Sequence, residues 1–161
     1  RAAATDPDGK YDYLREHIAS ALVDRLEDIT REFPCALDLG AHAGHLYRAI
    51  SAQPGLGGKG GIGGIEHLTQ CDFSEQALLR GITKAREARE AREPRGMLGK
   101  WLGGEGGEAK VEAGVNVGTR HVLVDEEFLP FAPHSFDLVL SNLALHWVND
   151  LPGALQQIKQ V

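Results

Sequence analysis

Segments with strand-like and helix-like patterns alternate along this chain of 161 residues, and this alternation constrains the fold more than any other feature. The strand-like segments are short apolar runs bounded by turn residues, which is typical of buried strands. They lie at 35–39, at about 65–71, at 120–124 and at 136–141. Strands that alternate with helices predict an α/β domain, with a parallel sheet covered on both faces.

The helix-like segments have start signals of their own. Apolar residues recur at helical spacing through 12–29, and Asp12 is placed to cap that helix. A second helix is expected from about His45, a third after the cap residue Ser74, and a fourth after Asp150. Each of the last three follows one of the predicted strands.

Glycine is concentrated in two stretches that interrupt this order. Residues 54–64 and, with a helical Ala-Arg-Glu repeat at 85–93, residues 81–118 are predicted to be low-complexity insertions. The remaining segments form one domain, expected to be the N-terminal cofactor-binding part of a longer fold.

Composition excludes several classes of protein. Lys and Arg number 17 and Asp and Glu 23, so the net charge of −6 disfavours binding to nucleic acid. The apolar runs are far shorter than the roughly 20 residues of a membrane-spanning helix. The two cysteines and seven histidines have no metal-ligand spacing, so no metal site is expected.

The first predicted strand leads into a glycine turn, Leu37-Asp38-Leu39-Gly40-Ala41-His42-Ala43-Gly44. Glycine lets the backbone turn sharply and lets a ligand approach it closely. The dinucleotide fingerprint needs glycines at its first, third and sixth positions, but the third here is His42 and the sixth is His45. An NAD site is therefore disfavoured.

The motif instead resembles the first motif of class I S-adenosylmethionine-dependent methyltransferases, although His42 replaces a middle glycine. The resemblance implies a doubly wound, Rossmann-like sheet whose strand order begins 3-2-1-4 and which is truncated here after the fourth strand and its helix. It also implies that Gly40, Ala41 and Gly44 wrap the methionine part of the cofactor, with Asp38 behind them.

Further acidic residues follow the second and third predicted strands, at the sheet edge where α/β folds bind ligands. By the same resemblance, Asp72 lies at the ribose, Asp125 with Glu126 lies at the adenine, and Phe73 beside Asp72 is a further cofactor-binding residue. The simpler interpretation of each carboxylate alone is a solvated group at a strand end.

A closer resemblance rests on four phrases, at 11–15, 33–40, 125–131 and 145–152. They are similar to a family of mitochondrial assembly factors for respiratory complex I within the methyltransferase type 11 subgroup. That family implies hydroxylation of an arginine on a complex I subunit, at the matrix side of the inner membrane, with peripheral membrane association.

The fourth predicted strand ends in candidate functional residues. Ser141 and Asn142 lie at the expected cofactor edge, and Asn142 and His146 are weak candidates for catalysis. Trp147 is expected to pack. Two alternatives remain open: an O-methyltransferase that acts on a carrier-protein thioester or small carboxylate, and a non-catalytic assembly chaperone.

Overall fold

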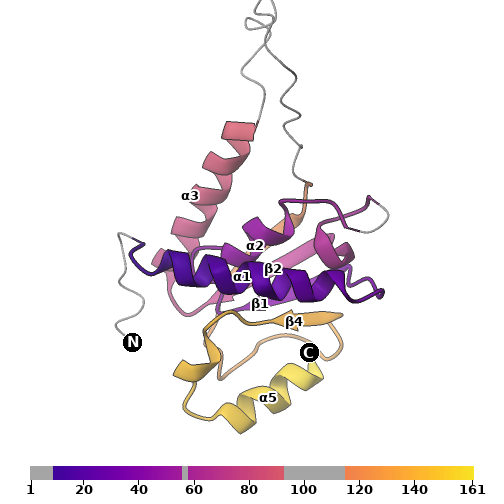
Figure 1. Cartoon of the computed structure of the whole chain (residues 1–161). Helices are drawn as coiled ribbons and strands as arrows, with labels where there is room; N and C mark the ends of the chain where they lie inside the picture. Colours follow the sequence, from indigo (N-terminus) through magenta and orange to yellow (C-terminus); the bar gives the residue numbers. More distant parts are fainter. Residues whose placement is uncertain (1–8, 56–57, 93–114) are drawn as a thin grey trace, which may run out of the picture.

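A four-stranded parallel sheet forms the centre of the computed structural model, which describes residues 9–55, 58–92 and 115–161 (Figure 1). Its strands are β1 (Cys35–Leu39), β2 (His67–Asp72), β3 (Gly118–Leu123) and β4 (Leu138–Leu140). The strand order is β3-β2-β1-β4, and every neighbouring pair is parallel. This confirms the expected α/β class and the expected start of the strand order.

The central strand, β1, explains why the sheet has this arrangement. It pairs with β2 on one side and with β4 on the other, so its apolar residues Leu37 and Leu39 are fully buried. The register places Leu39 opposite Cys71 and Asp38 opposite Leu140. The carboxyl ends of these parallel strands therefore meet at one edge of the sheet.

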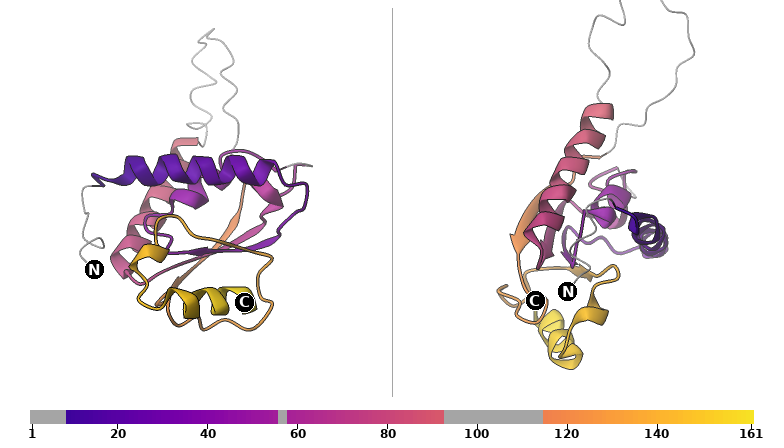
Figure 2. Two further views of the ribbon diagram at one scale, coloured as in Figure 1. Left: turned by 60° about the horizontal axis from the view of Figure 1, so that its bottom comes forward. Right: turned by 90° about the vertical axis from the view of Figure 1, so that its left-hand side faces the viewer.

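Three helices cover one face of the sheet: α1 (Asp12–Glu27), α2 (His45–Ile50) and α3 (Glu75–Arg92) (Figures 1 and 2). α1 and α2 share an apolar core with the strands beneath them, which includes Ala19, Val23, Leu26, Leu46, Ile50 and Leu68. Burial of the Val, Leu and Ile side chains among them contributes about 1.5–3 kcal/mol each. This core packs α1 against α2 and β1.

The other face is covered by α5 (Leu151–Gln160), which lies below β4 in Figure 1. Its core includes Leu37, Leu39, Cys71, Val124, Phe136 and Ile158. The predicted start signal is confirmed, because the Asp150 carboxylate accepts a hydrogen bond from Gly153 N at 3.0 Å. Short 3₁₀ turns, η2 (Ile62–Gly64) and η3 (Leu145–Trp147), complete the described elements.

The helix starts show one correction. Ser74 caps α3 as expected, because its hydroxyl accepts a hydrogen bond from Ala77 N at 3.3 Å. Asp12, in contrast, does not cap α1: the cap position belongs to Tyr11, and Asp12 is the first helical residue. Its carboxylate is instead drawn into ion pairs with Arg80 and Lys84 of α3.

The two glycine-rich stretches differ from simple flexible insertions where they are described. Gly61 forms bridges with Pro54 and Ile65, and Ile62 lies in the core. Residues 81–92 belong to α3. Gly81 packs closely on Ala43, because a Cβ built on Gly81 would lie 3.0 Å from the carbonyl carbon of Ala43. Residues 93–114 lie outside the described residues. Among the described helices, none is long and apolar enough to cross a membrane.

Candidate functional site

The loop after β1 turns tightly at the carboxyl edge of the sheet. Gly40 and Gly44 have φ angles of +75° and +70°, which are unfavourable for residues with a Cβ. A Cβ on Gly40 would lie 2.1 Å from the Cβ of Ala144, so Gly40 lets the loop after β4 approach. Gly40 N and Ala41 N both donate to the carbonyl of Cys71, at 2.9 and 2.8 Å. The predicted turn is thus bonded directly to the end of β2.

His42 occupies the middle of this loop in the left-handed conformation, with φ of 49°. This conformation accounts for the glycine that the general motif has at this position. His42 N donates to Asp72 Oδ2 at 2.8 Å, and the ring Nδ1 lies 3.6 Å from the same oxygen. Burial lowers the pKa of His42, against the opposing effect of Asp72, so the imidazole is neutral near pH 7.

Asp72 lies where the sequence predicts it, at the end of β2 and 5% exposed. Besides the bond from His42, its Oδ1 accepts a hydrogen bond from Ser74 N at 2.8 Å. A carboxylate has about four acceptor positions, so both oxygens retain capacity for further donors. Asp72 therefore shapes the loop and can also accept from ligand hydroxyls.

Asp38 lies behind the loop and is fully buried. Neither of its carboxylate oxygens has a hydrogen-bond partner among the described residues. Burial, with a smaller effect from the charge of Asp72, raises the pKa of Asp38 to about 8. An orphaned buried carboxyl group next to a glycine loop fits a ligand that brings a positive charge or hydrogen-bond donors.

Ser141 and Asn142 follow β4 at the same edge. The Ser141 hydroxyl donates to the carbonyl of Leu39 at 2.8 Å. The Asn142 side chain is buried, and its Nδ2 donates to the carbonyl of Arg15 in α1 at 2.9 Å. Its Oδ1 is buried without a partner among the described residues. One N–H of the Asn142 amide thus holds α1 in place, and the buried oxygen remains available to a ligand.

The residues expected at the adenine come to this edge as well. Asp125 Oδ1 accepts a hydrogen bond from Glu127 N at 3.0 Å in the turn after β3. Glu126 Oε1 lies 3.7 Å from the position of a Cβ built on Gly40, so its side chain reaches the glycine loop. The ring of Phe73 is 50% exposed beside Asp72. The structure therefore brings the predicted residues from the ends of four strands together.

His146 and Trp147 lie in η3, on the surface. Their rings contact each other, with 4.9 Å between centroids. The expected packing of Trp147 is partial, because its ring contacts that of His146 but the residue is 51% exposed. The 3₁₀ turn follows Leu143, whose φ of 55° redirects the chain, and it leaves both rings facing outward.

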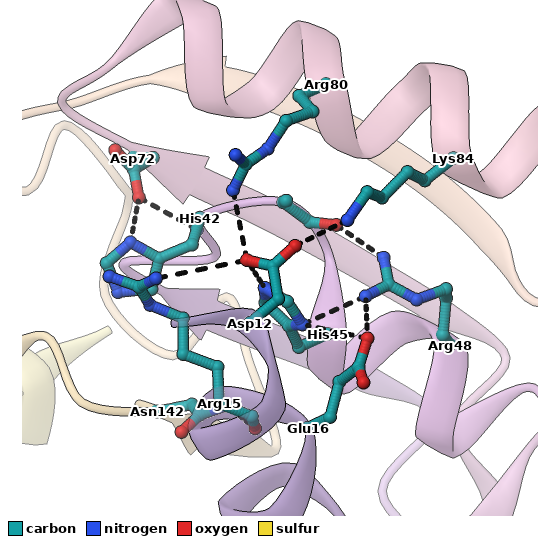
Figure 3. Close-up of polar contacts among 11 residues, drawn as sticks. Asp12, Arg15, Glu16, His42, His45, Arg48, Asp72, Arg80, Lys84 and Asn142 are labelled. Carbon is teal, nitrogen blue, oxygen red and sulfur yellow. Dashed lines mark hydrogen bonds and ion pairs between the residues drawn. The ribbon is translucent and has the colours of Figure 1, made fainter. Parts of the chain in front are cut away.

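A polar cluster that no sequence pattern indicates is centred on Asp12 (Figure 3). The Asp12 carboxylate accepts hydrogen bonds from Lys84 Nζ at 2.5 Å and from Arg80 Nη2 at 3.2 Å. Burial acts to raise the pKa of Asp12, but the bond from Lys84 and the neighbouring cations outweigh it, and the pKa is lowered. The cluster ties α1 to α3 beside His45, the first residue of α2 after the glycine loop.

His45 extends this cluster to α2. Its Nε2 lies 3.4 Å from Asp12 Oδ1, and its Nδ1 is 2.9 Å from Arg48 Nη2. Burial, followed by the charge of Arg48, lowers the pKa of His45 to about 3, so the ring is neutral and Nδ1 accepts from Arg48. Arg48 Nη1 also donates to the carbonyl of Ala43 at 2.6 Å. Arg48 thus holds the end of the glycine loop, and His45 links α2 to Asp12 of α1.

A cavity lies outside this site, at the opposite edge of the sheet. This cavity of about 260 Å³ is lined by residues that include Leu26, Glu32 and Gly63. These residues lie at the end of α1 and before β1 and β2, at the opposite edge of the sheet. Among the described residues, no group of three or more His, Cys, Asp or Glu side chains is arranged to hold a metal ion.

A family model described as a methyltransferase domain matches residues 37–161, from the strand before the glycine loop to the end of the chain. This chain belongs to the methyltransferase-domain family. The match includes the whole described carboxyl edge, so the glycine loop and both acidic strand ends are parts of a methyltransferase fold.

The chain is also similar in sequence to individual proteins of known name. This chain is 36% identical over 152 residues to "Arginine-hydroxylase NDUFAF5, mitochondrial" of Danio rerio, and the match covers 94% of this chain and 35% of the relative. It is 50% identical over 42 residues to the malonyl-[acyl-carrier protein] O-methyltransferase of Halorhodospira halophila, covering 26% of this chain and 14% of that protein. The chain thus spans about a third of the length of the NDUFAF5 relative that it matches.

Solved structures show the same fold. The crystal structure of a SAM-dependent methyltransferase from Aquifex aeolicus superposes with a TM-score of 0.52 at 15% sequence identity. The match covers 89% of this chain and 57% of that one. At this identity the likeness supports the Rossmann-like fold expected from the sequence.

Proposed function

We propose that the carboxyl edge of this sheet binds S-adenosylmethionine, whose sulfonium supplies an activated methyl group when the cofactor is bound. The observation that carries the proposal is the convergence of a glycine loop, an orphaned buried carboxyl and a second carboxylate at one edge. The family match adds support, because it covers all of these residues.

The assignment of residues follows the order of the strands. Residues 40–44, which include Gly40, Ala41 and Gly44, wrap the methionine part, and Asp38 faces its ammonium group. Asp72 accepts from the ribose hydroxyls through the acceptor capacity that His42 and Ser74 leave.

The adenine lies between the ends of β2 and β3. Phe73 offers an exposed ring to it, and Asp125 and Glu126 accept from its amino group. Ser141 and Asn142 line the side of the site nearest β4, where the Asn142 oxygen faces no described partner. Asn142 and His146 remain the candidates for catalysis, and His146 is the more accessible of the two.

We infer further that the protein acts in the assembly of mitochondrial respiratory complex I, by hydroxylating an arginine of a complex I subunit. The likeness to NDUFAF5 supports this, because that relative is named a mitochondrial arginine hydroxylase. The protein then works at the matrix side of the inner membrane, in peripheral contact with it. Hydroxylation adds one oxygen atom, which S-adenosylmethionine does not carry, so a separate oxygen donor is required.

The test is rescue of a cell that lacks the protein. Wild-type protein is expected to restore complex I and to add the mass of one oxygen to a subunit arginine, whereas Asp72→Ala at equal abundance restores neither. Asp24→Ala, on the exposed side of α1, is the control carboxylate and is expected to rescue fully. Full rescue by Asp72→Ala would favour a non-catalytic assembly chaperone.

An O-methyltransferase is the second candidate, favoured by the 50% identity over 42 residues to a malonyl-carrier-protein methyltransferase. Incubation with S-adenosylmethionine labelled in its methyl group separates the two activities. Label on a carrier-protein thioester or small carboxylate would support methyl transfer. An oxygen added to arginine without label would support hydroxylation.

A further inference from the structure

Arg15 of α1 is a buried cation with little compensation. Its side chain is 12% exposed, and its Nε is buried without a hydrogen-bond partner among the described residues. The ion pair that the structure gives it joins Nη1 to Asp12 Oδ1 at 4.0 Å, beyond hydrogen-bond distance. A buried guanidinium is costly unless an anion pairs with it closely.

Asp12 is already occupied by other cations. Lys84 donates to its Oδ2 and Arg80 to its Oδ1, both at closer distances than Arg15. The labelled side chains of Figure 3 include four that are cationic at neutral pH, Arg15, Arg48, Arg80 and Lys84, against the carboxylates Asp12, Glu16 and Asp72. The cluster therefore holds an excess of positive charge at the glycine loop.

The position of Arg15 is fixed from two sides. Asn142 holds its backbone carbonyl, and the ion pair with Asp12 keeps its side chain in the cluster. Figure 3 shows the guanidinium beside His42 of the glycine loop. Its charge also acts to lower the pKa values of both His42 and His45, which agrees with this placement.

The loop itself has few donors left for an anion. The N–H groups of Gly40 and Ala41 bond to Cys71, that of His42 bonds to Asp72, and that of Gly44 bonds to the carbonyl of Ala41. A carboxylate that approaches this loop must therefore find its donors on a side chain. Arg15 offers a planar fork that matches a carboxylate.

We propose that Arg15 binds the α-carboxylate of the amino-acid end of the cofactor, and that the first turn of α1 is thereby a wall of the binding site. The inference rests on the proposed binding of S-adenosylmethionine. It gives α1 a function that the glycine motif does not include, and it gives the orphaned Nε of Arg15 a partner. Asn142 then acts as a positioning residue, because it holds the turn that carries Arg15.

Calorimetric titration with two ligands tests this inference. S-adenosylhomocysteine has the amino-acid end, whereas 5′-methylthioadenosine has the same nucleoside without it. Arg15→Gln is expected to weaken binding of S-adenosylhomocysteine by about 10- to 100-fold and to change binding of 5′-methylthioadenosine by less than about twofold. Arg25→Gln, on the exposed side of α1, is the matched control and is expected to change neither affinity.

The alternatives give distinct results. Equal weakening of both ligands, or of neither, would overturn the role of Arg15 while leaving cofactor binding intact. Wild-type protein that is folded and binds neither ligand would overturn the proposed cofactor itself. If Arg15→Gln does not fold, as judged by circular dichroism, Arg15→Lys takes its place. Lys retains the charge but loses the fork, so a smaller loss confined to S-adenosylhomocysteine is expected.

Discussion

Replacement of Asp38 by Asn tests whether this buried carboxyl group is kept for a ligand at the expense of stability. Asp38 is fully buried, and neither carboxylate oxygen has a hydrogen-bond partner among the described residues. Burial, with a smaller contribution from the charge of Asp72, raises its pKa to about 8. Asn has nearly the same shape and cannot ionise, so the substitution removes the titration and preserves the packing.

The expected stability change follows from the pKa shift. Because the folded-state pKa lies above the ordinary value of 3.8 for an aspartate, the stability that Asp38 contributes is complete below about pH 4. It is lost progressively between about pH 4 and pH 8. At pH 7 the raised pKa of Asp38 corresponds to a loss of about 4 kcal/mol of stability. The free energy of unfolding of Asp38→Asn is therefore expected to exceed that of wild type by at most about 4 kcal/mol.

Urea unfolding of both proteins between pH 4.5 and pH 8.5 measures this difference. The gap between Asp38→Asn and wild type is expected to widen with rising pH and to level off above pH 8. Asp24→Asn, an exposed carboxylate of α1, is the control and is expected to track wild type. An Asp38→Asn protein that is less stable at pH 7, or a gap that does not vary with pH, would refute the reasoning.

Three further predictions concern the geometry of the loop and its support, at Gly40, Asp12 and His42. Gly40→Ala is expected to destabilise the fold by about 3 kcal/mol in urea unfolding, because its Cβ would meet that of Ala144 and φ is +75°. The double variant Gly40→Ala with Ala144→Gly is expected to regain part of the lost stability. If it regains none, the clash with Ala144 is not the cause of the loss. Asp12→Asn is expected to cost about 2 kcal/mol, since it breaks a largely buried ion-pair cluster. Glu16→Gln, at a side chain 57% exposed, should cost less than about 0.5 kcal/mol, and equal costs would refute the central role of Asp12. His42→Gly removes a left-handed backbone strain of about 1 kcal/mol, but it also raises the conformational entropy of the unfolded chain. The free energy of unfolding is therefore expected to change by less than about 1 kcal/mol, and cofactor affinity is expected to be retained. Loss of affinity in a titration would show that the imidazole itself contacts the ligand.

Local sequence signals predicted most of the sheet. The apolar run of β1, the glycine turn after it and the caps Ser74 and Asp150 depend on neighbouring residues, and the structure bears them out. The acidic strand ends meet at one edge because parallel strands place their carboxyl ends together, which the strand pattern alone implies.

The features that sequence reasoning missed depend on contacts between distant residues. Asp12 looked like a helix cap because its partners Arg80 and Lys84 lie 68 and 72 positions further along the chain. Arg15 belongs to the phrase at 11–15 that carries the closer resemblance, but an amphipathic helix has many charged positions and the sequence does not say which of them becomes buried. Trp147 packs against His146, but the sequence does not indicate that the turn after Leu143 leaves it 51% exposed.

The most direct test of the central claim is a calorimetric titration of the folded protein with S-adenosylhomocysteine, beside Asp72→Asn. The melting temperature of each protein serves as a check, because Asp72 also accepts hydrogen bonds from His42 N and Ser74 N. We expect wild-type protein to bind S-adenosylhomocysteine saturably and Asp72→Asn to bind it at least about tenfold more weakly. Folded wild-type protein that does not bind, or equal binding by the variant, would contradict the claim that this sheet edge is a cofactor site.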